Sequence, residues 1–526
     1  MMILIFASIF FNNLTLSSYY TKTFVFPWHT CAIFSTGFFS QVSLLFPFCY
    51  VKLIQIRSMR TQHYLQKELN IMNKHKRSTF SGKLGFVLSA AGASVGLGNI
   101  WRFPYLAAKY GGGIFLLVYI ILALTFGYTL IMAETSLGRM TRKSPVGAFQ
   151  TFGKSRFLSL GGWINAIIPI LIVPYYSVIG GWVIKYLTEY FSGHSDALAS
   201  DAYFTSFISN GWSTEICFVI FTLFTLGIIY AGVRNGIERV SKFMMPILIV
   251  LSLIIAIYSV TRPGAIQGVK YFLIPNFDHF SWMTVVSAMG QMFYSLSIAM
   301  GILITFGSYM KEDTSIENST ENVEIFDTAI AIMAGLMIIP AVFAFSGGDA
   351  ATLKSGPALM FITIPKVFAN MGFGTAIGIV FFLLVLFAAV TSSIALTESA
   401  VSTFEDELHW SRRKSTVFMG AIILILGTLS CLGYGPLANV KFLGMQFLDF
   451  FDFVTNSVMM PIAAIATCLL VSKVVGVETL EEEITKDGQP FKRKAVFCFM
   501  IKYLCPIFAA IILISSVANA FGIITM

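Results

Sequence analysis

The stretch SAAGASVGLGNIWRFPYLAAKYGGG, residues 89–113, carries glycines and strongly polar side chains between two apolar runs. Gly92, Gly96 and Gly98 are followed closely by Asn99 and Arg102. Placing a cation at mid-membrane costs about 2.5–3.5 kcal/mol, which a helix that only packs does not recover. Unwound backbone that lines a cavity offers carbonyl groups to cations and amides to an anion. The stretch indicates a binding site, and the alternative is a close-packing glycine motif.

A second interruption supports the binding-site interpretation. The segment GQMFYSLSIAMG, residues 290–301, places Ser295, Ser297 and Gly301 in the middle of another long apolar run. Two interrupted apolar segments at corresponding positions of two halves are typical of transporters built from inverted repeats, whose site lies at the repeat interface.

Two further polar features fall at membrane depth. Thr391, Ser392 and Ser393 are consecutive, and Ala388 lies one turn before Thr391 on the same helix face. Hydroxyls next to a backbone carbonyl suit a small hard cation, although such side chains often only bond back to the preceding turn. Asp327 is a functional candidate because carboxylates inside membrane helices are costly. The alternative for Asp327 is a solvated residue near the start of its helix.

The elements that hold these residues must be membrane helices. Of the 526 residues, 56% are hydrophobic and only 12% are charged, against about 25% charged in soluble domains. The net charge of +9 resides in loops between apolar runs, so a nucleic-acid partner is not expected. The seven cysteines show no C-x-x-C spacing and are expected to be free thiols.

Runs of about 20 apolar residues predict an all-α membrane protein with about eleven spans. The expected spans are 84–107, 112–137, 163–190, 214–231, 240–261, 281–309, 325–346, 372–403, 416–433, 447–472 and 497–524. Their order predicts a first five-helix repeat at 84–261, a second at 281–472, a loop at 473–496 and an eleventh helix at 497–526, with the first and sixth spans broken.

The distribution of basic residues predicts the orientation. One set of alternate loops holds seventeen Lys and Arg residues and the other set holds six. Because cytoplasmic loops are enriched in these residues, residues 72–83 are predicted to be a cytoplasmic tail and 473–496 a cytoplasmic loop. The protein is expected to be a multi-pass protein of the cell membrane that works as a monomer.

Residues 1–71 do not fit this pattern. Their apolar pieces are interrupted by polar residues and prolines, and one or two extra spans are an alternative. Lys67-Glu68 can be encoded by a bacterial ribosome-binding sequence three codons before Met72. We therefore expect translation to begin at Met72, which makes 1–71 an untranslated or non-native extension.

Several motifs together resemble one family. SAAGASVGLGNIWRFPYLAAKYGGGIF, PYYSVIGGW, FYSLS, SGPALMFITIP, TSSIA and FEDEL occur in the order typical of the neurotransmitter:sodium symporters. The resemblance runs from about Lys76 to the end of the chain and is nearest to the bacterial amino-acid transporters, which have the leucine-transporter fold. It implies alternating access, with Na⁺ entry coupled to amino-acid uptake, and it implies neither an enzyme nor an organic cofactor.

The resemblance implies two sodium sites and a substrate site between the broken helices. The implied ligands of site one are Ser94, Asn99, Ser295 and Asp327, and those of site two are Gly92, Val95, Ala388, Thr391 and Ser392. The implied substrate contacts are Ser94, Gly96, Leu97, Gly98, Tyr176, Tyr294, Ser295, Ser297, Met300, Ser392 and Leu396. The implied gates are Arg102 with Asp452 outside and Arg77 with Asp406 inside, and Asp449 is a competing outer partner.

The sequence departs from the family pattern in informative places. Asp327 stands where asparagine is common, so it could supply the negative charge for which many relatives need chloride. Ser94, Tyr294 and Ala358 also differ from the common alanine, phenylalanine and glycine. Gly96 leaves room for a substrate carboxylate, so we expect a neutral amino acid with a hydrophobic or aromatic side chain. The alternatives are an amino-acid sensor that does not transport and an ion channel.

Overall fold

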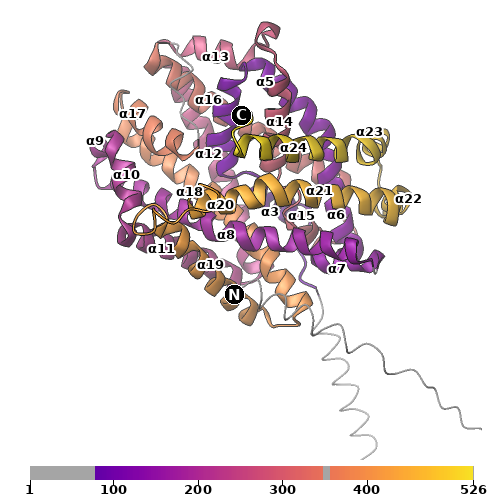
Figure 1. Cartoon of the computed structure of the whole chain (residues 1–526). Helices are drawn as coiled ribbons and strands as arrows, with labels where there is room; N and C mark the ends of the chain where they lie inside the picture. The colour runs from indigo at the N-terminus through magenta and orange to yellow at the C-terminus, as the bar shows by residue number, and fades with distance from the viewer. Residues whose placement is uncertain (1–76, 154, 348–355, 525–526) are drawn as a thin grey trace, which may run out of the picture. The chain divides into compact units, whose positions relative to one another are not determined.

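The computed structural model describes residues 77–153, 155–347 and 356–524, so the predicted extension 1–71 lies outside it. Within this part of the chain there is no β-strand longer than an isolated bridge. Nine helical segments are long and apolar enough to cross a membrane. They are Gly113–Thr141 (α5, η2 and α6), Arg156–Phe191 (α8), Gly211–Tyr230 (α11), Val233–Val260 (η3 and α12), Ile316–Ser346 (α16), Gly374–Glu407 (α18), Arg412–Leu432 (α19), Phe447–Val475 (α20, η7, α21 and η8) and Lys494–Ala520 (α23, η10 and α24) (Figure 1).

Two more spans are interrupted, as the glycines and polar residues predicted. The first consists of Lys83–Ser94 (α3) and Gly98–Lys109, with η1 at Gly98–Arg102 and α4 at Phe103–Lys109, and it bends by 53° at the break. The sixth consists of Trp282–Ser295 (α14) and Ile302–Ser308 (α15). Between them, Ser297, Ala299 and Gly301 have φ values of 54°, 60° and 69°. Because these angles are left-handed, no α-helix can continue through the segment.

Short helices connect the spans. Their bounds are Pro145–Phe152 (α7), Ser195–Leu198 (α9), Asp201–Ser209 (α10), Ala265–Leu273 (α13), Phe277–His279 (η4), Leu359–Thr363 (η6), Ile364–Ala369 (α17), Val477–Ile484 (α22) and Lys486–Gly488 (η9). All five cysteines among the described residues are free, as expected: Cys217, Cys431, Cys468, Cys498 and Cys505.

Several helices begin well before the predicted spans. Three helices extend beyond the predicted spans that start at 163, 240 and 325, because α8 begins at Arg156, η3 at Val233 and α16 at Ile316. The apolar run marks only the part of a helix inside the hydrocarbon. In α16 the polar first turns are stabilised by the Ser315 cap, whose hydroxyl accepts the Asn318 N–H at 3.4 Å.

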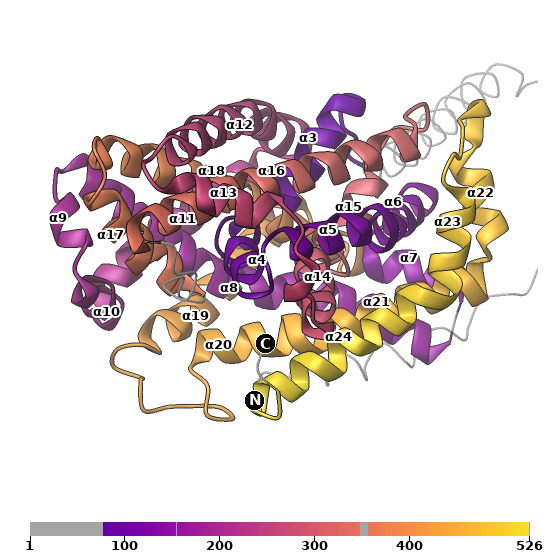
Figure 2. The ribbon, with the colours of Figure 1, turned by 90° about the horizontal axis from the view of Figure 1, so that it is seen from above.

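Spans that occupy the same position in the two predicted repeats pack against each other. The third span, α8, packs along the eighth, α18, and the fourth, α11, along the ninth, α19. The first half-helix, α3, contacts α12, α16 and α18, which places it among other helices (Figure 2). The eleventh span adds α24 along α21, outside the repeats (Figures 1 and 2).

The half-helix α15 lies very close to α6 because each carries a glycine at the contact. A Cβ atom on Gly307 would collide with the Thr135 carbonyl oxygen, and one on Gly138 with the Ile304 carbonyl oxygen. Small residues allow this backbone approach in a membrane. The contact fixes the position of α15, the second half of the sixth span.

We predict that Gly307→Ala destabilises the protein by about 1–3 kcal/mol, the usual range for overpacking. The apparent melting temperature in detergent should fall. Gly227→Ala is the control, since nothing lies within 4 Å of a Cβ atom there. Equal effects of the two substitutions would contradict the assignment of a close contact at Gly307.

Candidate functional site

A small cavity lies between the two helix breaks. Its volume is about 30 Å³, room for a water molecule or two, whereas ligand pockets usually measure several hundred. Its lining consists of residues from both breaks, α8 and α18: Ala93, Ser94, Gly96, Leu97, Gly98, Asn99, Ile172, Tyr176, Tyr294, Ser295, Ser297, Met300, Ser392 and Leu396. Every predicted substrate contact is among them. None of the lining side chains carries a charge.

The first group of oxygen atoms centres on Asp327. Asn99 Nδ2 donates to Asp327 Oδ1 at 2.8 Å, and Ser295 Oγ donates to both carboxylate oxygens at 2.9 and 3.0 Å. Tyr119 adds a hydroxyl at 3.2 Å from Oδ2. Asp327 is fully buried, and α16 begins well before it at Ile316. The alternative of a solvated boundary residue is therefore wrong.

The second group of oxygen atoms joins α18 to the end of α3. Ser392 Oγ lies 3.4, 3.1 and 3.3 Å from the carbonyl oxygens of Gly92, Ala93 and Val95. Thr391 Oγ1 donates one turn back in α18, to the carbonyl oxygens of Phe387 at 3.0 Å and Ala388 at 3.2 Å. The five residues predicted for the second sodium site thus gather in one place. Carbonyl and hydroxyl oxygens of this kind suit a small hard cation.

Ser94 behaves differently from the other predicted residues. Its hydroxyl donates to the Ala90 carbonyl at 3.2 Å, one turn back in α3. This is the ordinary behaviour of a serine inside a membrane helix. The extra hydroxyl at this position is therefore engaged locally, and only the Ser94 carbonyl remains a candidate ligand.

The space beside the first break is shaped by glycines. The Leu97 N–H donates to the Tyr176 hydroxyl at 3.4 Å. A Cβ atom on Gly96 would lie 2.8 Å from Ser392 Oγ, and one on Gly98 would lie 2.6 Å from the Tyr294 ring. Neither position has room for a side chain, and the cavity beside them is lined by the Tyr176 hydroxyl without a fixed negative charge.

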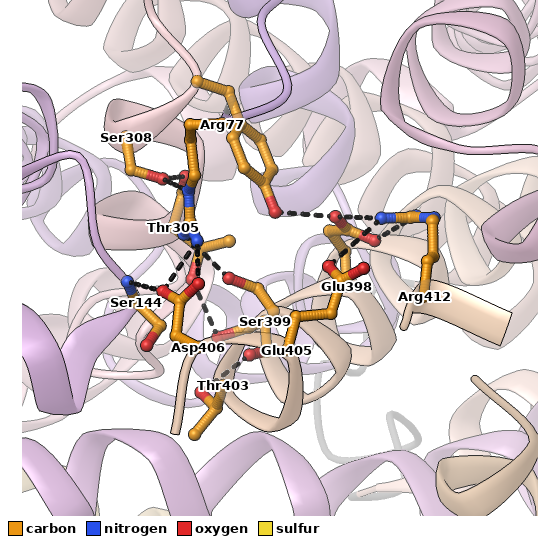
Figure 3. Close-up of polar contacts among 12 residues, drawn as sticks. Arg77, Ser144, Thr305, Ser308, Glu398, Ser399, Thr403, Glu405, Asp406 and Arg412 are labelled. Atoms are coloured by element: carbon orange, nitrogen blue, oxygen red, sulfur yellow. Dashed lines mark hydrogen bonds and ion pairs between the residues drawn. The ribbon is translucent and has the colours of Figure 1, made fainter. Parts of the chain in front are cut away.

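The predicted inner pair is formed. Arg77 Nη1 lies 2.5 and 2.6 Å from the two carboxylate oxygens of Asp406, and Arg77 also donates to Ser308 and Ser402 at 3.0 and 2.8 Å (Figure 3). The Ser144 N–H donates to Asp406 at 2.6 Å. Burial alone would lower the pKa of Arg77, but Tyr309 and Asp406 raise that pKa above its usual value. Arg77 therefore stays charged.

A second buried ion pair adjoins the first. Arg412 Nη1 and Nη2 donate to Glu398 at 3.0 and 2.6 Å, and the Tyr309 hydroxyl donates to the same carboxylate at 2.8 Å (Figure 3). The guanidinium of Arg77 stacks on the Tyr309 ring at 5.0 Å. Tyr309 thus connects the two ion pairs, which close this end of the bundle.

The predicted outer pair is apart. Arg102 and Asp452, both in the described part of the chain, form no ion pair with each other. Arg102 lies over the Tyr294 ring at 5.4 Å, while Asp452 accepts hydrogen bonds from Tyr175 at 3.2 Å and Asn456 at 2.5 Å. The competing Asp449 is exposed and bonds to the Tyr434 hydroxyl at 3.3 Å.

Sequence reasoning missed several buried polar residues that support the breaks. Glu134 in α6 accepts the Ala299 N–H at 2.8 Å, and Gln291 in α14 donates to the Gly98 carbonyl at 3.1 Å. Both side chains are fully buried. The signal was present: Glu134 and Glu398 are carboxylates inside apolar runs, the same feature that singled out Asp327.

Comparisons with known proteins identify the family of the chain. The model of the sodium:neurotransmitter symporter family matches residues 77–218 and 188–523. An uncharacterized sodium-dependent transporter, YhdH, of Bacillus subtilis is 33% identical over 86% of this chain and all of its own length. An uncharacterized sodium-dependent transporter of Haemophilus influenzae is 30% identical over 84% of this chain and 99% of its own length.

A solved structure provides the comparison of folds. The crystal structure of MhsT in complex with L-phenylalanine has a TM-score of 0.75 and 33% identity. The match covers 84% of this chain and 100% of that one. The predicted fold class, an inverted repeat with broken first and sixth helices, is thereby confirmed.

We predict that Asp327→Ala destabilises the protein more than Asp327→Asn does. The alanine variant leaves Asn99 and Ser295 without their buried acceptor, at about 1–3 kcal/mol for each unpaired group. The asparagine variant keeps one acceptor oxygen. Thermal unfolding in detergent without added ligand measures the difference, and equal melting temperatures for both variants would rule out this account of the cluster.

Proposed function

This chain belongs to the sodium:neurotransmitter symporter family of sodium-dependent transporters, and we propose that it imports a neutral hydrophobic or aromatic amino acid together with Na⁺. The observation that carries the proposal is the meeting of two oxygen clusters and an uncharged cavity at the two helix breaks. MhsT, of similar fold and sequence, binds L-phenylalanine.

The proposed binding mode assigns a role to each break. The Leu97 and Gly98 amides and the Tyr176 hydroxyl bind the substrate carboxylate beside Gly96, where the Leu97 N–H now donates to the Tyr176 hydroxyl. The carbonyl groups of the sixth-span break, residues 296–301, accept the ammonium group. The substrate side chain lies among Ile172, Met300 and Leu396.

The cavity dimensions bear on the mechanism. A volume of about 30 Å³ does not hold a side chain as large as that of phenylalanine, so Tyr294, Met300 or Leu396 must shift when substrate enters. Met300 suits this role because methionine has an unbranched, flexible side chain. Closure of Arg102 onto Asp452 then separates the site from the outside.

Two sodium ions are proposed at the two oxygen clusters. Site one consists of the Ser94 carbonyl, Asn99, Ser295, Asp327 and the substrate carboxylate, and site two consists of the cluster around Thr391 and Ser392. Each charge that enters down 100 mV supplies about 2.3 kcal/mol. A tenfold sodium gradient adds about 1.4 kcal/mol per ion. Two ions supply roughly 7 kcal/mol, which drives substantial accumulation.

The gates define a transport cycle. The inner pair Arg77–Asp406 is closed and the outer pair Arg102–Asp452 is apart, which is the arrangement of an outward-facing protein. Sodium favours this state, substrate closes the outer gate, and opening of the inner pair releases the load. In the cell membrane, residues 77–83 would then face the cytoplasm, and one chain contains a complete site.

We predict sodium-dependent uptake of neutral amino acids by proteoliposomes that contain the purified protein. Radiolabelled phenylalanine, leucine, methionine, tryptophan and tyrosine should accumulate with an inward sodium gradient and not with potassium in its place. Gly96→Ala should abolish uptake, because its Cβ would occupy the carboxylate space. Binding without uptake would support a sensor, and ion flux far above carrier turnover would support a channel.

A second prediction concerns chloride. Asp327 places a fixed carboxylate in site one, so replacing chloride by gluconate at constant sodium should leave uptake unchanged. Asp327→Asn removes this charge and should reduce uptake at least tenfold in gluconate, with partial recovery in chloride. Loss of wild-type uptake on chloride removal would refute the role given to Asp327.

A further inference from the structure

Residues 476–493, which connect the tenth and eleventh spans, cover the inner end of the bundle. We name this segment the strap. Its helix α22 packs beside α6, as both views show (Figures 1 and 2). Val477, Leu480 and Ile484 on one face of α22 are at most 3% exposed. The strap is therefore seated on the membrane helices.

One buried arginine connects the strap to two other elements. The side chain of Arg139, at the end of α6, is 1% exposed. Its Nε lies 2.6 Å from Glu483 Oε1, and Nη2 donates to the Glu483 carbonyl oxygen. Its Nη1 donates at 2.7 Å to the carbonyl oxygen of Thr314, which lies between the sixth and seventh spans. A buried guanidinium without its carboxylate partner is strongly unfavourable.

The connection 309–315 leads from Arg139 to the inner gate. Tyr309 at its start stacks under Arg77, and Ser308 just before it accepts a hydrogen bond from Arg77. Arg142 donates to the Met310 carbonyl, and Lys486 of the strap lies 3.0 Å from Glu312. A continuous series of contacts thus connects the strap to Arg77.

The far end of the strap has a second attachment. The backbone N–H groups of Lys492 and Arg493 donate to the Glu317 carboxylate at 2.8 and 3.0 Å. Arg493 also pairs with Glu321 at 3.4 Å and Glu324 at 3.2 Å. The strap is therefore attached to α16 as well as to α6.

We propose that the strap holds the inner gate closed through Arg139 and Glu483, which act as positioning residues for transport. The inference rests on the proposed function, since it assumes alternating access. Tyr309 and Arg77 must move when the inner side opens, and the strap restrains the connection that carries Tyr309. Contacts made only in the closed state shift the population toward the outward-facing conformation.

A matched pair of substitutions in α22 tests the proposal. Glu483→Gln weakens the buried pair with Arg139, whereas Glu481→Gln removes an equally short pair with Lys494, just after the strap, that is partly exposed to solvent. Hydrogen exchange measured by mass spectrometry should rise several-fold in residues 77–88 and 309–315 of Glu483→Gln. Glu481→Gln should leave both segments unchanged.

Transport kinetics provide the second readout. Because fewer molecules face outward, the apparent KM for external substrate should rise several-fold in Glu483→Gln while the maximal rate is kept or raised. Glu483→Asp should restore both values toward wild type. Lys486→Gln, at an exposed position that does not threaten folding, should show a smaller change in the same direction.

The outcomes separate the strap from the transport hypothesis. Faster exchange confined to residues 473–496, or identical behaviour of Glu481→Gln and Glu483→Gln, overturns the proposal. A lower maximal rate with unchanged KM also overturns it. If the wild type shows no sodium-dependent uptake, the proposed function fails. The exchange experiment then still decides whether the strap limits hydrogen exchange in residues 77–88.

Discussion

The structure depends on how the backbone N–H and C=O groups at the two helix breaks find hydrogen-bond partners. A helix interrupted inside a bilayer exposes amides and carbonyls that lipid cannot satisfy, so other groups must satisfy them. The protein meets this requirement with side chains from neighbouring helices. Glu134 accepts the Ala299 N–H, Gln291 donates to the Gly98 carbonyl, and Ser392 donates to carbonyls at the end of α3. The breaks therefore depend on neighbouring helices for their hydrogen bonds.

Buried carboxylates occur at several places in the bundle, and three of them lie beside the breaks or near the Arg77–Asp406 pair. Asp327 lies beside the first break, Glu134 beside the second, and Glu398 near the inner end. Their partners differ in a way that fits their positions. Glu398 has a guanidinium partner, Glu134 has a backbone amide, and Asp327 has only hydroxyls and an amide side chain. Asp327 is therefore the carboxylate best able to accept an added cation.

Sequence reasoning predicted the breaks because their residues are costly at membrane depth. Asn99 and Arg102 favoured a binding site over a plain packing helix, and Ser297 and Gly301 marked the second interruption. The gathering of Asp327, Asn99 and Ser295 followed from the family resemblance, and the structure places them within hydrogen-bonding distance. The helix ends were predicted less well, because Glu317 and Glu321 continue α16 through pairing with residues distant in sequence. Glu134 was not predicted because the span 112–137 was identified only by its number of apolar residues.

The two ends of the bundle are held by interactions of very different strength. At the inner end, Arg77, Arg139 and Arg412 each have a short contact with a carboxylate. At the outer end, Arg102 has only the face of Tyr294, and Asp452 bonds to neutral groups. Breaking an ion pair with a largely buried partner costs more than parting a cation from a ring. The contacts at the Arg77 end are therefore the more costly ones to separate in this structure. The cluster around Asp327 joins Asn99 of the first break to Ser295 at the second, whereas Ser392 contacts the carbonyls at the end of α3, so the two clusters connect different parts of the breaks.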